Sequence, residues 1–270
     1  MTESVTSSST VVRITLLLAV LAEAEGDLSL GEIAERMKLP TSTTHRLLNL
    51  LLEQGFVERG EANRTYRAGL EFLRLGGLVV SRMEVTEVAQ NFMRAVVDAC
   101  DETVMLSLYV PRSQTSMIGK VIYGSHPLRY EAQMYHPTSL AWGATGRGIL
   151  AFLPEQVIAQ VLAREEPSPV TAKPAKASVI KRDLAQIARQ GYAHSRGQKV
   201  SGAVGLSAPV FNSKGVIGAL CITIPESRFQ DNMTARLVRV LTEQAARFSA
   251  TLGHRDSARP AVKASASRAA

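Results

Sequence analysis

The stretch of residues 28–67 is the feature that most limits how this chain can fold. Apolar residues at helical spacing predict a short helix over Leu30–Met37. Leu39-Pro40 then interrupts the chain, and a second amphipathic helix is predicted from Thr41 to Gln54. Two extended runs around a Gly/Asn turn follow in residues 56–67 and predict a β-hairpin. Helix, break, helix and hairpin is the layout of a winged helix-turn-helix.

Local signals support the boundaries of these elements. An earlier amphipathic helix is predicted from Val11 until Gly26 stops it. Ser29 stands three residues before Glu32, which is the spacing of a capping box at a helix start. Gly55 has the position of a C-terminal stop for the second helix of the motif. The motif is therefore predicted to begin and end within these residues.

The second helix of the motif would present its N-terminal end to DNA. Free backbone N–H groups and short hydroxyls at such an end can meet phosphates or base edges. We expect Arg46 and the hydroxyls of Thr41–Thr43 to read bases, and the other cations to contact phosphates. The predicted DNA-binding residues are Arg36, Lys38, Thr41, Ser42, Thr43, His45, Arg46, Arg64 and Arg67.

The charge distribution has to be considered locally. The chain has a net charge of +7, yet residues 1–81 hold eight basic and ten acidic residues. Between Arg36 and Arg46 there are three basic residues and no acidic one. The predicted DNA-binding face is therefore positive although its domain is not.

A second interpretation fits the same helices equally well on periodicity alone. Short amphipathic helices also occur in domains that never contact DNA. A run of Ser and Thr before a helix often serves only as its N-cap, and Arg46 could equally be a solvated surface charge.

The second half of the chain has a different pattern of apolar residues, in which predicted strands and helices both occur. This pattern predicts an α+β fold. Helices are predicted over residues 69–82 and 85–99 before the first strand. The later predicted strands are 104–110, 117–123, a weaker one at 128–135, 203–211 and 216–224, and the later helices are 146–152, 155–164, 179–190 and 233–252. Residues 165–177, rich in Pro, Ala and Lys, are expected to form a surface loop.

Several classes of protein are disfavoured. The two cysteines, Cys100 and Cys221, are far apart, which favours a reducing compartment over a disulfide framework. The early run of residues 14–22, which is apolar except for Thr15, is too short to span a membrane, and no Lys or Arg precedes Arg13 as in a signal peptide. We therefore expect a cytoplasmic protein with no membrane partner.

Metal, cofactor and catalytic motifs are not found in the sequence. The five histidines have no spacing suited to helical metal binding. No GxSxG, P-loop or dinucleotide fingerprint stands in a usable context, and Cys221 lies within an apolar strand, where a small buried hydrophobe is expected. We expect no cofactor, no metal and no enzyme activity.

Several blocks, in the right order, resemble the IclR-type bacterial transcriptional regulators. The similarity extends over about residues 11–252. The blocks are Leu28–Ala34, Leu39–Leu48, Glu53–Val57, Gly146–Glu155, Gly191–Ala193, Ala208–Phe211 and Gly215–Leu220.

This resemblance implies a domain organisation and partners. It implies a GAF-like effector domain with a mostly antiparallel sheet, a homodimer formed through the DNA-binding domains and often a dimer of dimers. The implied effector is a small organic or aromatic acid, and the implied DNA partner is a double-stranded operator. The domains are then a disordered leader (1–10), a winged helix-turn-helix (11–68), a linker helix (69–82), the effector domain (83–252) and a disordered basic tail (253–270).

By the same resemblance, three segments form the effector pocket. They are the loop 139–146, the strand around 205–207 and the strand bearing Cys221 and Thr223, whose side chains alternate onto one face. The predicted effector-binding residues are Leu140, Trp142, Gly143, Ala144, Gly205, Ser207, Cys221 and Thr223.

The chain departs from the family pattern within this pocket. The loop 141–147 lacks the His and Thr of the family's His-x-Thr-Ala-x-Gly-Lys pattern and carries a lone Trp142 instead. Residues 195–198 replace acidic residues, and Cys221-x-Thr223 replaces Ser-x-Ser. These changes suggest a less polar pocket that takes an aromatic or bulkier acid. Trp142 could equally pack in the core or at a tetramer contact.

The sequence therefore predicts a ligand-responsive, DNA-binding regulator of a catabolic operon, either repressor or activator. The alternative is a metabolite-binding module or enzyme whose N-terminal helices serve only for association. A MarR-like winged-helix protein is disfavoured, because the long segment after the linker has its own α/β pattern.

Overall fold

The computed structural model describes residues 9–60, 64–81 and 84–254 and divides into two compact units. The first unit spans Met1–Met83 and the second Glu84–Ala270. The predicted leader and basic tail lie outside the described residues, apart from residues 9–10 and 253–254. Thr10, placed in the leader by the sequence, already belongs to the first helix.

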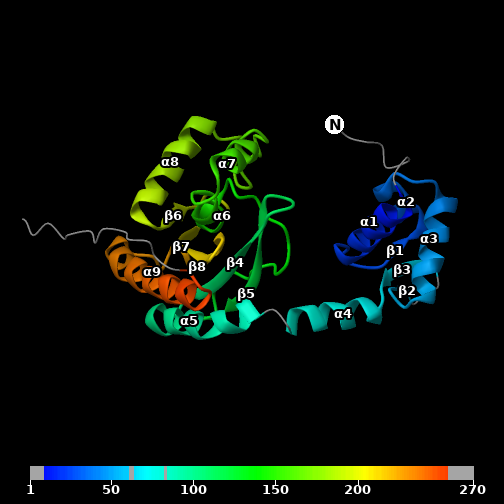
Figure 1. Ribbon diagram of the computed structural model, residues 1–270, viewed down its shortest axis with the longest axis horizontal. Helices are drawn as coiled ribbons and strands as arrows, with labels where there is room; N and C mark the ends of the chain where they lie inside the picture. Colours follow the sequence, from blue (N-terminus) through cyan, green and yellow to red (C-terminus); the bar gives the residue numbers. More distant parts are fainter. Residues whose placement is uncertain (1–8, 61–63, 82–83, 255–270) are drawn as a thin grey trace, which may run out of the picture. The chain divides into compact units, whose positions relative to one another are not determined.

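The first unit is a helical domain with a small sheet (Figure 1). Its elements are α1 (Thr10–Ala22), β1 (Leu28–Ser29), α2 (Leu30–Met37), α3 (Thr41–Glu53), β2 (Val57–Arg59), β3 (Thr65–Ala68) and α4 (Leu70–Ser81). The predicted helices and the hairpin of β2 and β3 are confirmed, and the strands lie in the order β1-β3-β2. The sequence does not predict β1, because two residues carry no recognisable strand pattern.

Local hydrogen bonds and apolar packing fix the helix-turn-helix. The capping box is confirmed: the Glu32 N–H donates to Ser29 Oγ at 3.3 Å, and the Ser29 N–H donates to Glu32 Oε2 at 2.7 Å. Leu47 and Leu48 of α3 are almost completely buried against Ile33 of α2 and the rest of the unit's core. The apolar face of α3 is therefore turned inward, which fixes its polar face toward the surface.

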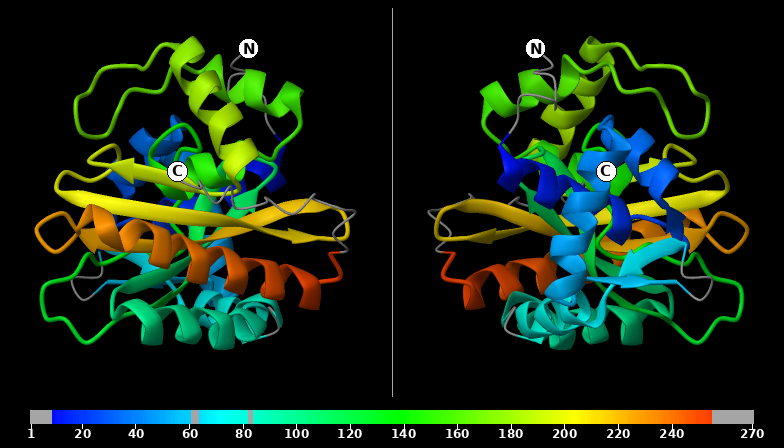
Figure 2. Two further views of the ribbon diagram at one scale, coloured as in Figure 1. Left: turned by 90° about the vertical axis from the view of Figure 1, so that its left-hand side faces the viewer. Right: turned by 90° about the vertical axis from the view of Figure 1, so that its right-hand side faces the viewer.

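The second unit is a five-stranded antiparallel sheet with helices on both faces. Its strands, β4 (Thr103–Val110), β5 (Thr115–Ile122), β6 (Ala193–Arg196), β7 (Ala203–Asn212) and β8 (Gly215–Pro225), lie in the order β5-β4-β8-β7-β6. One face carries α5 (Glu84–Cys100) and α9 (Thr234–Thr251), which follows the short 3-10 turn η2 (Asp231–Met233) (Figure 1). The other face carries α6 (Gly143–Leu150), α7 (Glu155–Leu162) and α8 (Ala177–Gln190) (Figure 2).

The weak strand predicted at residues 128–135 is wrong. This segment is a loop with one isolated bridge to β5, between Met134 and Ile118, and a second bridge, between Thr138 and Ser116, lies just beyond it. Pro127 and Pro137 flank it, and a proline has no N–H to donate to a sheet ladder. The segment instead passes along the edge of the sheet, where its side chains become available to a cavity.

Within the described part of the chain, no helix is long and apolar enough to cross a bilayer.

Candidate functional sites

The N-terminal end of α3 is a polar, exposed surface. Pro40 precedes the helix, no acidic residue stands in the first turn, and the first N–H groups of a helix have no partner within it. Thr41 and Ser42 are exposed and Thr43 is half-buried. Thr44 is buried, and its hydroxyl donates to the Pro40 carbonyl at 3.1 Å. The helix therefore offers two hydroxyls and its positive dipole end to an approaching phosphate or base.

Two further side chains extend this surface along α3. His45 and Arg46 are both exposed, one turn beyond the first hydroxyls. His45 Nδ1 lies 3.5 Å from Asn49 Nδ2, so the imidazole is held along the helix. Together with Thr41 and Ser42, they form a contiguous set of hydrogen-bonding groups on one short stretch of backbone.

The other predicted cations lie on the elements that flank α3. Arg36 is exposed in the last turn of α2, and Lys38 is exposed at its C-cap with a left-handed φ of 54°. Arg64 and Arg67 are exposed beside and on β3, but Arg67 Nε lies 3.6 Å from Glu58 Oε2 on the paired strand β2. Part of the charge of Arg67 is therefore already balanced.

One cation of the hairpin was not predicted as a DNA contact. Arg59 on β2 is exposed, and its guanidinium lies 5.3 Å from the centre of the Tyr66 ring. Its position on a strand of the predicted basic hairpin was the available signal.

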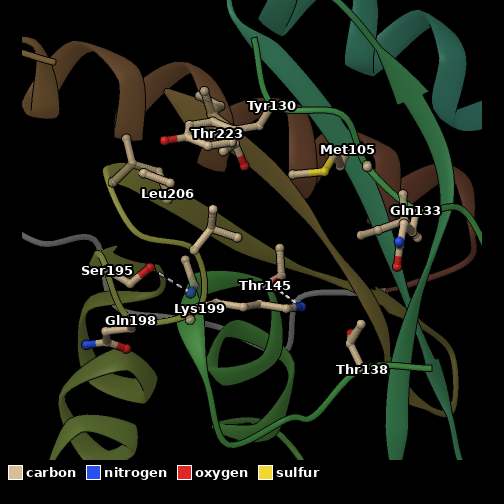
Figure 3. Close-up of a pocket in the computed structure, with 18 of the residues that line it drawn as sticks. Met105, Tyr130, Gln133, Thr138, Thr145, Ser195, Gln198, Lys199, Leu206 and Thr223 are labelled. Atoms are coloured by element: carbon tan, nitrogen blue, oxygen red, sulfur yellow. Dashed lines mark hydrogen bonds between the residues drawn. The ribbon is translucent and has the colours of Figure 1, made fainter. Parts of the chain in front are cut away.

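The second unit contains a cavity of about 360 Å³ at the start of α6 (Figure 3). Residues of β4 to β8, of the segment 130–138, of the start of α6 and of the segment 198–200 line it. Its apolar walls include Met105, Ile118, Leu206 and Ile222. Its polar lining includes Tyr130, Gln133, Thr138, Thr145, Ser195, Gln198, Lys199 and Thr223.

Four of the eight predicted pocket residues line this cavity: Gly143, Ala144, Gly205 and Thr223. They come from the start of α6, from β7 and from β8. The Ala144 N–H donates to Ser195 Oγ at 2.9 Å, which ties the start of α6 to β6.

The other four do not line the cavity, which corrects the predicted pocket. Ser207 and Cys221 form a cross-strand pair beneath α6, and both are almost completely buried. The Ser207 hydroxyl donates to the Ala144 carbonyl at 2.6 Å, and a Cβ added at Gly148 would lie 2.0 Å from Ser207 Oγ. The helix thus sits directly on these side chains and shields them from the cavity. Leu140 is fully buried in the same core.

Trp142 is a core residue. Its side chain is 7% exposed, and its Nε1–H donates to the Glu166 carbonyl at 3.0 Å. The Arg147 guanidinium lies 5.7 Å from the centre of its ring. The structure thus places the indole in the core and not among the residues that line the cavity.

The cavity is also more polar than the sequence suggested, because Lys199 lies in it. Lys199 Nζ donates to Thr145 Oγ1 at 3.4 Å, and burial lowers the pKa of this lysine. Lys199, Tyr130 and Thr138 were not predicted from the sequence, because they come from segments far apart in the chain. The only signal was that Lys199 directly follows the altered stretch 195–198.

A second, polar cavity of about 310 Å³ adjoins the first and shares Gly143, Ala144, Ser195 and Gln198 with it. It contains Arg147, whose Nη1 lies 2.6 Å from Asp183 Oδ2. Burial lowers the pKa of Arg147 and Asp183 opposes that shift, so this cation already has its counter-charge.

Neither metal binding nor thiol chemistry is supported among the residues that the structure describes. No group of three or more His, Cys, Asp or Glu side chains there could hold a metal ion. Burial raises the pKa of Cys100 to about 11 and that of Cys221 to about 12, so both thiols stay protonated and unreactive near neutral pH.

A helix-turn-helix unit joined to a unit with a cavity of ligand size defines the class of ligand-responsive, DNA-binding regulators. The model of the IclR helix-turn-helix domain matches residues 10–61. The model described as "Bacterial transcriptional regulator IclR C-terminal" matches residues 77–250. The chain therefore belongs to the IclR family of bacterial transcriptional regulators.

Individual relatives agree with this assignment. The transcriptional repressor IclR of Escherichia coli (strain K12) is 25% identical over 239 residues, which cover 88% of this chain and 87% of that protein. The crystal structure of an IclR-type regulator from a Silicibacter species has a TM-score of 0.81 at 22% identity, and the match covers 92% of this chain and 97% of that one.

A third relative carries a ligand. An IclR homolog from Microbacterium hydrocarbonoxydans, solved in complex with 4-hydroxybenzoate, has a TM-score of 0.76 at 22% identity, with 90% of this chain and 99% of that chain covered. The curated relatives are named regulators or repressors rather than enzymes. The chain is accordingly a DNA-binding regulator with an effector domain and not an enzyme.

Proposed function

We propose that α3 reads an operator in the major groove while the cavity at α6 binds a small acid that changes operator affinity. The observation that carries this proposal is the start of α3. It combines exposed hydroxyls, an exposed Arg46 and no acidic residue in its first turn, while Leu47 and Leu48 anchor its other face. This is what a recognition helix requires.

We assign roles within this surface by side-chain chemistry. Arg46 can donate two hydrogen bonds to a guanine, and the hydroxyls of Thr41–Thr43 together with His45 can meet other base edges or phosphates. The cations outside α3 contact phosphates and supply the salt-dependent part of the affinity. They are Arg36, Lys38, Arg64 and Arg67.

The effector is a small organic or aromatic acid. A cavity of about 360 Å³ is within the size range of small-molecule sites, and its walls combine apolar side chains with a few polar ones. The homolog crystallised with 4-hydroxybenzoate supports an acid of this size. An effector that binds one arrangement of the protein better shifts the population toward it, which changes operator affinity.

The assembly is a homodimer, and two dimers form a tetramer. Large apolar side chains at the surface of the first unit support this, because Val11 of α1 is 69% exposed and Leu70 and Leu73 of α4 are each 71% exposed. A symmetric dimer would place two recognition helices on two operator half-sites. The regulator acts in the cytoplasm on a catabolic operon.

Selection of binding sites from a pool of random-sequence duplexes tests the proposal with the full chain. We expect a two-fold symmetric consensus, with half-sites about one or two helical turns apart. Retention of duplexes without any sequence preference would contradict it. Sedimentation of the wild type against Leu73→Glu would test the dimer, since a charge on this exposed apolar helix should favour monomers.

A further inference from the structure

We propose that Lys199 selects anionic effectors: its ammonium group, together with the Thr145 hydroxyl, forms the end of the cavity that binds a carboxylate. The preferred effector is then a monocarboxylic acid with an apolar body. This inference rests on the proposed function, because it assumes that the effector occupies the cavity at α6.

The position of the Lys199 side chain is fixed by α6. Its stem crosses Gly143, which has a φ of +73° and no side chain. A Cβ added at Gly143 would lie 3.0 Å from Lys199 Cβ, so any other residue there would crowd the stem. From this position Nζ reaches Thr145 Oγ1 at 3.4 Å, and both groups face the cavity (Figure 3).

Within the part of the chain that the structure describes, the charge of Lys199 is not balanced by a carboxylate as the charges of Arg147 and Arg228 are. Arg147 lies 2.6 Å from Asp183, and Arg228 lies 2.7 Å from Glu102. For Lys199, by contrast, no carboxylate oxygen of a described residue lies within 4.0 Å of Nζ. Burial lowers the pKa of Lys199, which is the expected effect of desolvation without a counter-ion. A ligand carboxylate would supply the missing charge.

The surroundings of this end of the cavity also favour one anionic group. Thr145 stands in the first turn of α6, where no acidic residue is present and the helix dipole is positive. Besides its polar side chains, the cavity has the apolar side chains of Met105, Ile118 and Leu206 in its walls, which can contact an apolar ligand body. The lining also contains the carboxylate of the exposed Glu131, which disfavours a ligand that carries more than one negative charge. These features together favour a monocarboxylate over a dicarboxylate or a neutral ligand.

Calorimetric titration of the full chain with matched acids and amides tests this assignment. The probes are benzoate and benzamide, 4-hydroxybenzoate and 4-hydroxybenzamide, and phenylacetate and phenylacetamide. They are titrated into three proteins: the wild type, Lys199→Met and the control Lys214→Met. Lys199→Met keeps a side chain of similar length without the charge. Lys214→Met removes an exposed charge in the turn between β7 and β8. We expect Lys199→Met to weaken acid binding about 10- to 100-fold. The amides should bind both proteins with similar affinity, and Lys214→Met should match the wild type.

Three results would overturn the inference: equal weakening of acids and amides, unchanged acid binding by Lys199→Met, or no acid binding by the wild type at millimolar concentration. Equal weakening would mean that Lys199 acts through packing alone. If Lys199→Met binds acids normally and acids still change operator affinity, only this inference fails. If Lys199→Met loses acid binding but acids never change operator affinity in the wild type, the inference holds and the proposed function fails.

Discussion

The start of α3 and the cavity at α6 gather their side chains from the chain in opposite ways. The α3 surface comes from consecutive residues, Thr41–Arg46, on one exposed helix end. The cavity draws on residues from Met105 to Thr223, which only the folded sheet brings together. The α3 surface is accessible to any DNA duplex, whereas the cavity binds its ligand by enclosing it. Changes at the two sites should therefore have separable effects, and the following substitutions test that separation.

The largest effect is expected from filling the cavity. Thr223 on β8 is half-buried, lines the cavity and lies opposite Gly205 on β7. We expect Thr223→Phe to reduce acid binding below detection in a calorimetric titration, because the ring occupies the ligand's space. Operator affinity without ligand should stay within about twofold, since the two sites share no residues.

Thr223→Val is the matched control, since it keeps the volume and removes only the hydroxyl. Normal acid binding by Thr223→Phe would show that the effector occupies another site.

The next largest effect is expected at α3. Arg46→Ala should cost about 1–3 kcal/mol at the selected operator if the guanidinium makes two hydrogen bonds to a guanine. The loss should be much smaller on unrelated duplexes, as measured by fluorescence anisotropy.

Arg36→Ala provides the comparison. As a phosphate contact it should weaken all sequences equally and reduce the slope of the salt dependence by about 1. If Arg46→Ala also weakens every sequence to the same extent, Arg46 contacts a phosphate and its assignment is wrong.

A third test concerns the packing of α6 on β7. A Cβ at Gly148 would lie 2.0 Å from Ser207 Oγ, so Gly148→Ala must disturb the buried hydrogen bond from Ser207 to Ala144. We expect the free energy of unfolding of the second unit to fall by about 1–3 kcal/mol. The single tryptophan, Trp142, lies in this unit, and its fluorescence during urea unfolding reports on the unit selectively.

Gly77→Ala serves as the control, because nothing lies within 4 Å of a Cβ added at this α4 position. It should leave the Trp142 transition unchanged. A Gly148→Ala protein as stable as the wild type would mean that α6 can shift away from β7 at little cost.

The smallest effect is expected at the capping box of α2. Hydrogen bonds from Ser29 lower the pKa of Glu32 from 4.5. A carboxyl with a lowered pKa in the folded state stabilises that state above its unfolded pKa, and the contribution is lost as the pH falls through the folded pKa. The protection factors of the amides in residues 30–37, which are the exchange rates corrected for their intrinsic pH dependence, should therefore decrease below about pH 4.5 in the wild type. Glu32→Gln should lack this step, and an identical pH profile in both proteins would contradict the role of the carboxylate.

The first unit was predictable from the sequence because its signals are local. The capping box at Ser29 and the leucines of α3 lie within a few residues of what they determine. The strand β1 was not predicted, because only its pairing with β3 defines it as a strand.

The cavity was predictable only in part. Gly143, Ala144, Gly205 and Thr223 were found by resemblance, which transfers the positions of segments. The same resemblance misplaced Trp142, because the side chain of a loop residue can turn into the core or the cavity without any change in the local pattern. Lys199 was missed because its importance depends on the absence of a nearby carboxylate among the described residues, which is a property of the fold.

The proposed regulation depends on coupling between the cavity and DNA binding. The most direct measurement is the operator Kd of the full chain by fluorescence anisotropy. It is measured without ligand and again with a saturating concentration of an acid that calorimetry has shown to bind. The account predicts a change of about 5- to 100-fold, in either direction, that Thr223→Phe abolishes. An unchanged operator Kd with the cavity filled would contradict it.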